Sequence, residues 1–133
     1  VLDDYVWIAT NEGAARYDLL IEEWEIYDKR KGLPDPALID VVNLGAQIWF
    51  ASGKMFSEYD PDFEKWRHFK ISFAPDAQIK RMFLFNEDIW LVTNQGLVRF
   101  SPQLQTEQLF FLPYLREDHL LELFIEDENS VIP

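Results

Sequence analysis

The sequence predicts an all-β protein built of β-propeller blades, each a sheet of four antiparallel strands, because a tryptophan-centred unit recurs along the chain. Trp7, Trp49 and Trp90 lie in similar strand-like segments and follow one another at nearly equal steps. Each of these tryptophans is followed ten positions later by an aromatic residue: Tyr17, Tyr59 and Phe100. A fourth copy begins near the C-terminus, where Ile132 falls one further step after Trp90. Units of this length with several short strands are typical of propeller blades.

The second unit shows its four strands most clearly. Its apolar and β-branched runs predict strands over residues 38–44, 47–51, 56–59 and 64–69. Turn residues such as Gly45-Ala46 separate these runs, because glycine accepts the positive φ that a tight reversal needs. The segment 47–51 is apolar on both faces, so it must be covered on both. Blades that stack face to face around an axis provide this cover.

The repeat divides the single propeller segment 1–133 into about three blades. We expect them over about residues 1–33, 34–74 and 75–116, with the start of a next blade over about 117–133. Blade 1 lacks an inner strand of its own, and closed propellers need about four to eight blades. Two arrangements stay open: a segment of a longer propeller, or half of a six-bladed ring closed by a second copy. The alignment of the C-terminal residues with the N-terminal ones favours the first.

A second aromatic layer is expected on the outer strands. In the first two units an outer tryptophan, Trp24 or Trp66, follows the central one at the same spacing, and we expect both to pack. In the third unit Glu107 takes this position. We expect Leu109 and Phe110 to replace the missing tryptophan there after a shift in strand register.

Composition and charge exclude several classes of protein. The chain has 133 residues, of which 48% are apolar and none is cysteine, so it is long enough for a hydrophobic core and has no disulfide framework. Its formal charge of −12 would repel a nucleic-acid backbone or an anionic membrane surface. No run reaches the roughly 18 apolar residues of a membrane helix, so direct membrane insertion is not expected.

Several segments follow the order of one known repeat. The first unit reads Trp7-Ile8-Ala9-Thr10, Arg16-Tyr17-Asp18, Trp24 and Gly32-Leu33-Pro34. The third reads Trp90-Leu91-Val92-Thr93 and Gly96-Leu97, and the second keeps Trp49, Tyr59-Asp60-Pro61 and Trp66. The chain thus resembles the two-component-regulator propeller repeat, whose unit reads approximately Trp-Ile-Gly-Thr, Gly-Leu, Arg-Tyr-Asp, an outer aromatic and Gly-Leu-Pro. Its small Gly after Trp-Ile is replaced by Ala9, Ala51 and Val92.

The resemblance implies a location and a class of function. Propellers of that family form the extracytoplasmic sensor region of bacterial histidine kinases, and related ones occur in secreted and surface proteins. It therefore implies a periplasmic or extracellular module that senses a ligand or contacts a protein in two-component signal transduction. The chain itself contains no kinase, membrane or DNA-binding part.

Candidate ligand-binding residues lie in the links between blades. Asp35, Asp76 and Asp118 each precede the central position of the next unit at the same spacing, which places them on one rim. Carboxylates there would attract a cation or a basic group, whereas the alternative is that each aspartate caps a turn. Arg81 and His119 are further candidates, because loops on a rigid scaffold carry binding sites. Secondary candidates are Lys80, Arg116 and Asp40.

The sequence favours recognition over catalysis. It has no Gly-x-Ser-x-Gly elbow, no thiol, no glycine-rich phosphate loop and no histidine triad for a metal, so we expect no cofactor and no metal site. A propeller lyase or glycosidase stays a less favoured alternative. The expected ligand is a small polar molecule, a saccharide or a protein partner bound at the rim. The runner-up is a structural module that closes a propeller by homo-oligomerisation.

Overall fold

The chain, studied as a computed structural model, forms three antiparallel sheets, and the structure describes residues 4–71 and 76–110. We call the sheets blades 1, 2 and 3. Blade 1 contains β1 (Tyr5–Thr10), β2 (Gly13–Asp18) and β3 (Glu23–Tyr27). Blade 2 contains β4 (Leu38–Leu44), β5 (Gln47–Ser52), β6 (Phe56–Asp60) and β7 (Lys65–Phe69). Blade 3 contains β8 (Ile79–Phe85), β9 (Asp88–Thr93), β10 (Gly96–Ser101) and β11 (Thr106–Phe110).

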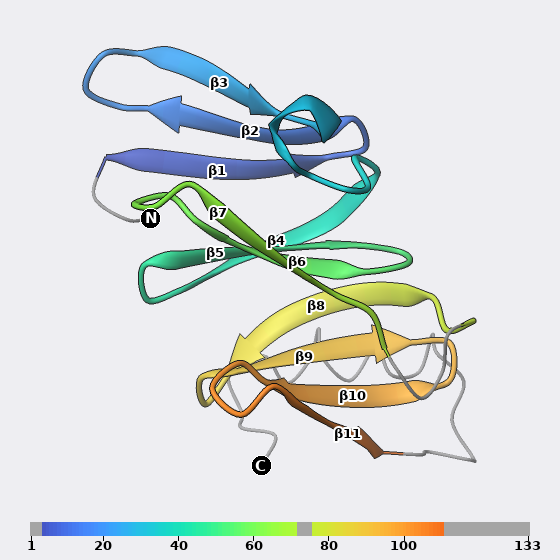
Figure 1. The fold of residues 1–133 in the computed structure, drawn as a ribbon. Coiled ribbons are helices and arrows are strands. Elements are labelled where there is room, and N and C mark those ends of the chain that lie inside the picture. Colours follow the sequence, from blue (N-terminus) through green and yellow to red (C-terminus); the bar gives the residue numbers. More distant parts are fainter. Residues whose placement is uncertain (1–3, 72–75, 111–133) are drawn as a thin grey trace, which may run out of the picture.

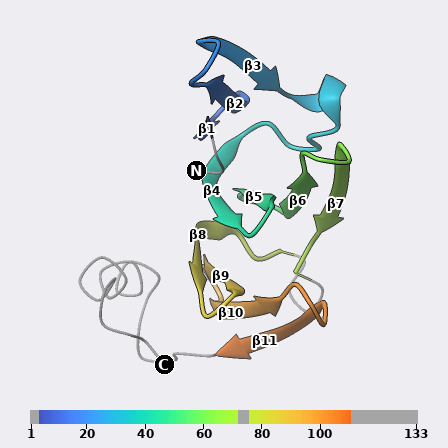
Figure 2. The ribbon, with the colours of Figure 1, turned by 90° about the vertical axis from the view of Figure 1, so that its left-hand side faces the viewer.

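The blades are simple meanders stacked face to face. Within each blade the strands pair in chain order, and a 3-10 helix, η1 (Lys29–Lys31), lies in the link between blades 1 and 2 (Figure 1). In a view turned by 90°, the inner strands β4 and β8 lie at one side of the stack, the outer strand β7 lies at the other, and the outer strand β11 runs along the bottom (Figure 2). In blade 1 the first described strand, β1, corresponds to β5 and β9, so no described strand occupies its inner position.

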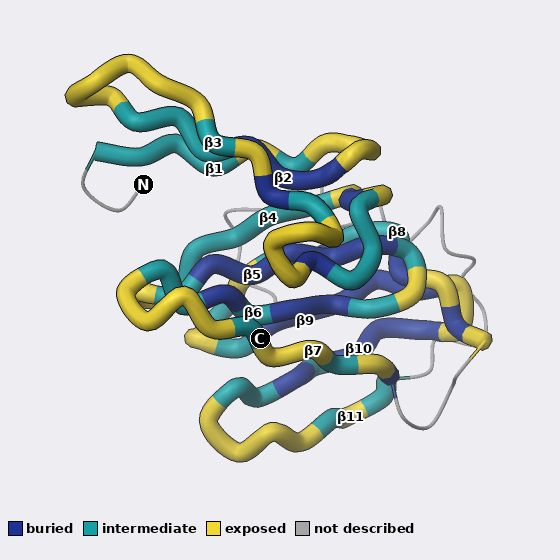
Figure 3. The backbone as a smooth tube through the Cα atoms, turned by 45° about the horizontal axis from the view of Figure 1, so that its top comes forward, coloured by how far each residue is buried: buried dark blue, intermediate teal, exposed yellow. Residues whose placement is uncertain are grey.

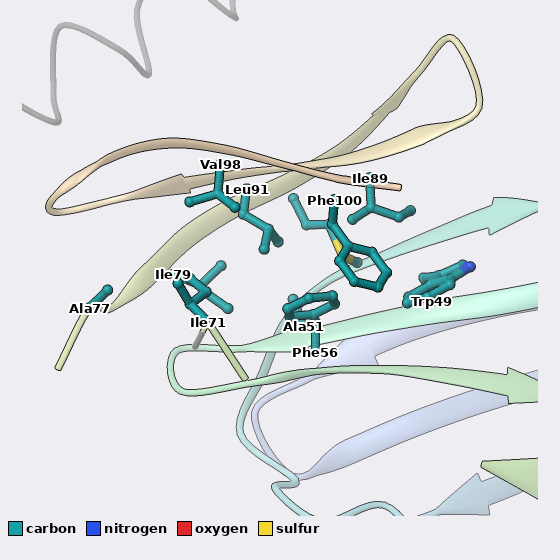
Figure 4. Close-up of a cluster of buried hydrophobic side chains, with 11 residues drawn as sticks. Trp49, Ala51, Phe56, Ile71, Ala77, Ile79, Ile89, Leu91, Val98 and Phe100 are labelled. Atoms are coloured by element: carbon teal, nitrogen blue, oxygen red, sulfur yellow. The ribbon is translucent and has the colours of Figure 1, made fainter. Parts of the chain in front are cut away.

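Two apolar layers hold the stack together. The layer between blades 1 and 2 contains Phe50 and Tyr59 from blade 2, packed against Trp7 and Tyr27 from blade 1. The layer between blades 2 and 3 has Trp49 at one end and Ala77 at the other (Figure 4), and the side chains drawn there are almost fully buried. Covering both faces of β5 in this way explains why its sequence is apolar without alternation.

The central tryptophan has the same surroundings in each blade. Its ring packs against an aromatic residue at the end of the outer strand, at the same spacing along the chain. The ring centroids are 5.1 Å apart for Trp7 and Tyr27, 5.7 Å for Trp49 and Phe69, and 5.8 Å for Trp90 and Phe110. The sequence repeat therefore corresponds to a repeat in three dimensions.

Two expectations about the outer layer are wrong. Glu107 pairs with Phe100 just as Trp24 pairs with Tyr17 and Trp66 with Tyr59, so blade 3 has no shift in register. Phe110 occupies the position of Tyr27 and Phe69 and does not replace the outer tryptophan, because ladder pairing fixes which face each side chain takes. Trp24, expected to pack, is 56% exposed.

Among residues 4–71 and 76–110 no helix is long and apolar enough to cross a membrane.

Candidate functional site

The predicted rim carboxylates are only partly within the described residues. Asp35 lies in the link before β4, and its Oδ1 accepts a hydrogen bond from the Ala37 amide at 3.1 Å, which is the turn-capping role. The crevice beside Asp35, lined also by Leu33 and Phe50, has no room for a water molecule. Asp76 is exposed in the turn that precedes β8. Ligand contact by these aspartates therefore stays a prediction.

Asp118, His119 and Arg116 lie outside the described residues.

The candidate Arg81, on the inner strand β8, forms an ion pair with Asp40 on the inner strand β4. Its Nε lies 3.7 Å from Asp40 Oδ2, and the same oxygen accepts a hydrogen bond from the Met82 amide at 2.8 Å. Asp40 pairs with Ala51 and Arg81 pairs with Val92, each just after a bulge, so the two residues hold the same position in successive blades. Burial raises the pKa of Asp40, while the Met82 amide and the Arg81 charge oppose the rise.

The structure brings together a different set of side chains at the junction of blades 1 and 2. There the chain forms a groove of about 310 Å³, which we call the aromatic groove. Blade 1 and its link line one side, and blade 2 with its β6–β7 turn lines the other. The lining residues are Arg16, Glu25, Tyr27, Lys31, Tyr59, Pro61, Glu64 and Trp66. The volume lies at the lower end of that of small-molecule sites.

Three aromatic rings form the wall of the aromatic groove. The centroids of Tyr27 and Tyr59 are 5.4 Å apart, and those of Tyr59 and Trp66 are 4.5 Å apart. The Trp66 indole donates a hydrogen bond to the Lys31 carbonyl at 2.8 Å, which fixes the ring against the link. Burial raises the pKa of Tyr27, so its hydroxyl stays protonated and able to donate.

The charged side chains of the groove are organised around Glu25. Its carboxylate accepts hydrogen bonds from Arg16 at 2.7 Å and from Lys31 at 2.5 Å. The Lys31 hydrogen bond, against the cost of burial, holds the pKa of Glu25 below its usual range. The two cations also lie over aromatic rings, Arg16 at 4.3 Å from the Tyr5 centroid and Lys31 at 4.8 Å from that of Tyr27. The network orients these polar groups, and Glu64, which also lines the groove, balances the second cation.

The equivalent junction between blades 2 and 3 has a second groove, of about 650 Å³. Three of its lining positions correspond to those of the aromatic groove: Pro102 takes the place of Pro61, and Glu58 with Arg67 takes the place of Arg16 with Glu25. The aromatic wall is absent from its lining, which includes Leu44, Gly45 and Gln47 instead. Aromatic lining is thus particular to the first junction among the described residues.

None of the groove residues is predicted from the sequence to bind a ligand; the sequence pattern assigns some of them to packing or to the repeat. One signal could have indicated the groove. The aromatic residue at the end of the outer strand is Tyr27 in the first unit but Phe69 and Phe110 in the others. Likewise Tyr59 of the second unit corresponds to Phe100 of the third. Since the first unit also has a tyrosine, Tyr17, at the position of Tyr59, only the hydroxyl of Tyr27 is particular to this junction.

The described residues thus form stacked antiparallel blades of three or four strands, which is the β-propeller type of fold predicted from the sequence. Among solved structures the chain is similar to the extracellular domain of BT4673 from B. thetaiotaomicron, described in one structure as a one-component system and in another as a hybrid two-component system. The TM-score is 0.70 in both, at 14% identity, over 85% and 84% of this chain. The extracellular domain of the hybrid two-component system BT3049 from the same organism gives 0.69, at 17% identity and 84% coverage.

These similarities concern the fold alone, since sequence identity is low. The chain spans 16–17% of the length of these structures. No protein-family model matches the chain, and no curated protein does either. Within residues 4–71 and 76–110 no three His, Asp or Glu side chains are grouped as metal ligands.

Proposed function

We propose that this chain is a non-catalytic recognition module of a propeller-type sensor, and that it binds a small, neutral, polar ligand in the aromatic groove. The observation that supports this most is the combination of three aromatic rings with an ordered polar network in one concave site. Sites for small molecules combine apolar walls with a few positioned polar groups. The periplasmic or extracellular location is part of the proposal and rests on the similarity to extracellular domains.

The charge balance of the groove favours a neutral ligand. Two cations, Arg16 and Lys31, face two carboxylates, Glu25 and Glu64, so the formal charge of the lining is zero although the whole chain carries −12. Desolvating a charged ligand without a matching charge is costly. A hydroxyl-rich molecule such as a saccharide can exchange hydrogen bonds with the network and contact the partly exposed Trp66 ring, whereas Tyr27 and Tyr59 are buried behind it.

The proposal is tested by titrating the chain with neutral oligosaccharides, and with acidic oligosaccharides and amino acids for contrast, using calorimetry and thermal shift. Arg16→Gln should weaken binding of a neutral ligand, because it removes one of the two cations bonded to Glu25 and leaves the groove lining with a formal charge of −1. Arg99→Gln is the matched control: Arg99 holds the same cross-strand position in blade 3, bonded to Gln108 at 2.7 Å, and should leave binding intact. Equal losses in both variants, or turnover of the ligand, would contradict the proposal.

A further inference from the structure

A buried hydrogen-bond donor lies unpaired in the apolar layer between blades 2 and 3. It is the indole nitrogen of Trp49, whose side chain is 0% exposed. Among the described residues, Trp49 Nε1 is the one buried side-chain nitrogen or oxygen that has no hydrogen-bond partner. Buried polar groups in folded proteins are almost always hydrogen-bonded, so an exception of this kind calls for a specific reason.

The corresponding tryptophan of blade 3 shows where an acceptor belongs. Trp90 Nε1 donates to the carbonyl of Phe85, the last residue of β8, at 3.3 Å. In blade 2 the same place is held by Leu44, the last residue of β4, and the spacing to the tryptophan is equal. The strands that carry the two tryptophans, β5 and β9, are both buried (Figure 3). Trp49 thus holds the place of Trp90 without the hydrogen bond to the inner strand.

The unpaired N–H lies directly behind the groove between blades 2 and 3, the second groove. Glu58 pairs with Trp49 across the ladder, and Gln47 lies two residues away on the same strand, so both share the face of Trp49. Glu58, Gln47 and Leu44 all line the second groove. In Figure 4 the Trp49 nitrogen points away from the other labelled side chains of the apolar layer. The donor is therefore directed at the groove lining and not into the core.

The second groove also has the size and charge of a binding site. Its volume of about 650 Å³ lies within the range of small-molecule sites. Glu58 is bonded to Arg67 at 2.6 Å, which compensates one charge of each sign. Asp60 of blade 2 and Glu87 of blade 3 then leave the lining with a formal charge of −2. A cationic group in the groove would be attracted by carboxylates from both blades.

We propose that the second groove binds a small organic cation that also carries a hydroxyl oxygen, such as an amino alcohol or an amino sugar. The ammonium group balances the carboxylates of Asp60 and Glu87, and the oxygen accepts the hydrogen bond of Trp49 Nε1. Since the nitrogen is covered, binding includes a change of rotamer at a lining side chain such as Gln47, which is a fast motion at a surface.

Both parts of the ligand are needed. A cation without an oxygen would leave the indole donor unpaired and dry, which is the costly state of a buried polar group. An anionic acceptor would meet Glu58, which lies opposite Trp49 on the same face, and like charges repel. The site differs from the aromatic groove in its position and in the charge of its ligand, so it does not depend on the function proposed for that groove.

The test follows the indole N–H resonances of the whole chain by NMR during titration with glucosamine at slightly acidic pH, where the amine is protonated. The Trp49 resonance is assigned through bonds, so the buried ring needs no replacement. N-acetylglucosamine has the hydroxyl groups without the charge, and cyclohexylamine has the charge without a hydroxyl group. We expect glucosamine to move the Trp49 proton downfield and saturably, cyclohexylamine to bind without that shift, and N-acetylglucosamine to leave Trp49 unchanged.

Glu87→Gln and Glu22→Gln form a matched pair of variants. Both glutamates are exposed turn residues with left-handed φ, +64° for Glu87 and +59° for Glu22, but Glu22 lies in the β2–β3 turn and lines neither groove. Glu87→Gln should weaken glucosamine binding by about two- to fivefold, because it removes one exposed charge contact. Glu22→Gln makes the same change in net charge and should leave the affinity intact.

The indole of Trp66 separates the two grooves in the same spectra, because it lines the aromatic groove and donates to the Lys31 carbonyl. The proposal is overturned if glucosamine moves Trp66 but not Trp49, or if N-acetylglucosamine or cyclohexylamine moves Trp49 as far as glucosamine does. Equal losses of affinity in the two glutamine variants would overturn it as well. Failure of neutral saccharides to bind the aromatic groove would instead contradict the proposed function alone.

Discussion

Replacing Gly32 by alanine is expected to weaken the junction of blades 1 and 2 more than an ordinary glycine replacement would. Gly32 follows η1 with φ +105° and ψ −1°, and its amide donates to the Lys29 carbonyl at 3.1 Å. A side chain at this φ is strained, and the added methyl group would meet the Trp66 ring at 2.7 Å. Two separate penalties therefore act at one position.

Their magnitudes follow from the geometry. Backbone strain for a residue other than glycine at such a φ costs about 1–2 kcal/mol. Forcing a methyl group into an occupied space costs about 1–3 kcal/mol more. Gly45→Ala is the matched control, since Gly45 also has a positive φ, +61°, but the nearest atom to its added Cβ is Gln47 Oε1 at 3.9 Å. Gly32→Ala should therefore lower the free energy of unfolding by about 1–3 kcal/mol more than Gly45→Ala.

Urea unfolding of both variants measures this difference in unfolding free energy. Repeating both replacements in a Trp66→Leu protein separates the steric clash with the ring from the backbone strain. In Trp66→Leu the shorter side chain leaves room for the methyl group, so Gly32→Ala should cost little more there than Gly45→Ala does. The unfolded chain gains the same rigidity in both alanine variants, so that contribution cancels in the comparison. Equal losses of unfolding free energy for Gly32→Ala and Gly45→Ala, or no coupling between Gly32→Ala and Trp66→Leu, would refute the steric argument.

Two further predictions concern charged groups. Asp40→Ala should cost about 1.5–3 kcal/mol in urea unfolding, because the Met82 amide loses a charged acceptor, whereas Asp40→Asn should cost less and Arg81→Gln below about 1 kcal/mol. If Arg81→Gln lowers the free energy of unfolding by more than this, the ion pair, and not the Met82 hydrogen bond, is the main contact between β4 and β8. Lys31 holds the pKa of Glu25 below its ordinary 4.5, so Glu25 contributes stability above that pH. This contribution is lost as pH falls through the folded-state pKa. The stability difference between wild type and Glu25→Gln should therefore shrink on acidification, and a constant difference would contradict it.

Most of the fold could be predicted from the sequence because the apolar positions of each repeat show which strand faces are buried. The segment 47–51 is apolar on both faces only because it is covered on both, and the structure places it as β5 between two apolar layers. Small boundary differences have local causes. The strand expected over 64–69 begins at Lys65, because Glu64 has φ +54° and belongs to the turn.

The candidate site could be predicted much less well. The aromatic groove joins Glu25 and Lys31 of blade 1 to Tyr59 and Trp66 of blade 2, and which faces of two blades meet is not visible in one strand pattern. A charged residue near a link is a weak sign of ligand binding. Arg81 shows why, since its partner Asp40 lies one full repeat away and becomes a neighbour only when inner strands stack.

The three blades share the same strand pairing but differ in the charges of one cross-strand pair of side chains. Each blade has a cross-strand polar pair between its outer strand and the strand beside it: Arg16–Glu25 in blade 1, Glu58–Arg67 in blade 2 and Arg99–Gln108 in blade 3. In blades 1 and 2 this pair faces the next blade. Backbone pairing fixes where each pair lies, so the two charges can exchange places, or glutamine can replace the carboxylate, without disturbing the ladder.

This freedom gives the two grooves different formal charges. The aromatic groove has a balanced lining, whereas the groove between blades 2 and 3 sets three carboxylates, Glu58, Asp60 and Glu87, against the single guanidinium of Arg67. Their formal charges are therefore 0 and −2. A neutral ligand should favour the first groove and a cationic one the second, because desolvation penalises an unmatched charge. Stacked blades can thus present chemically distinct sites at equivalent places without any change of fold.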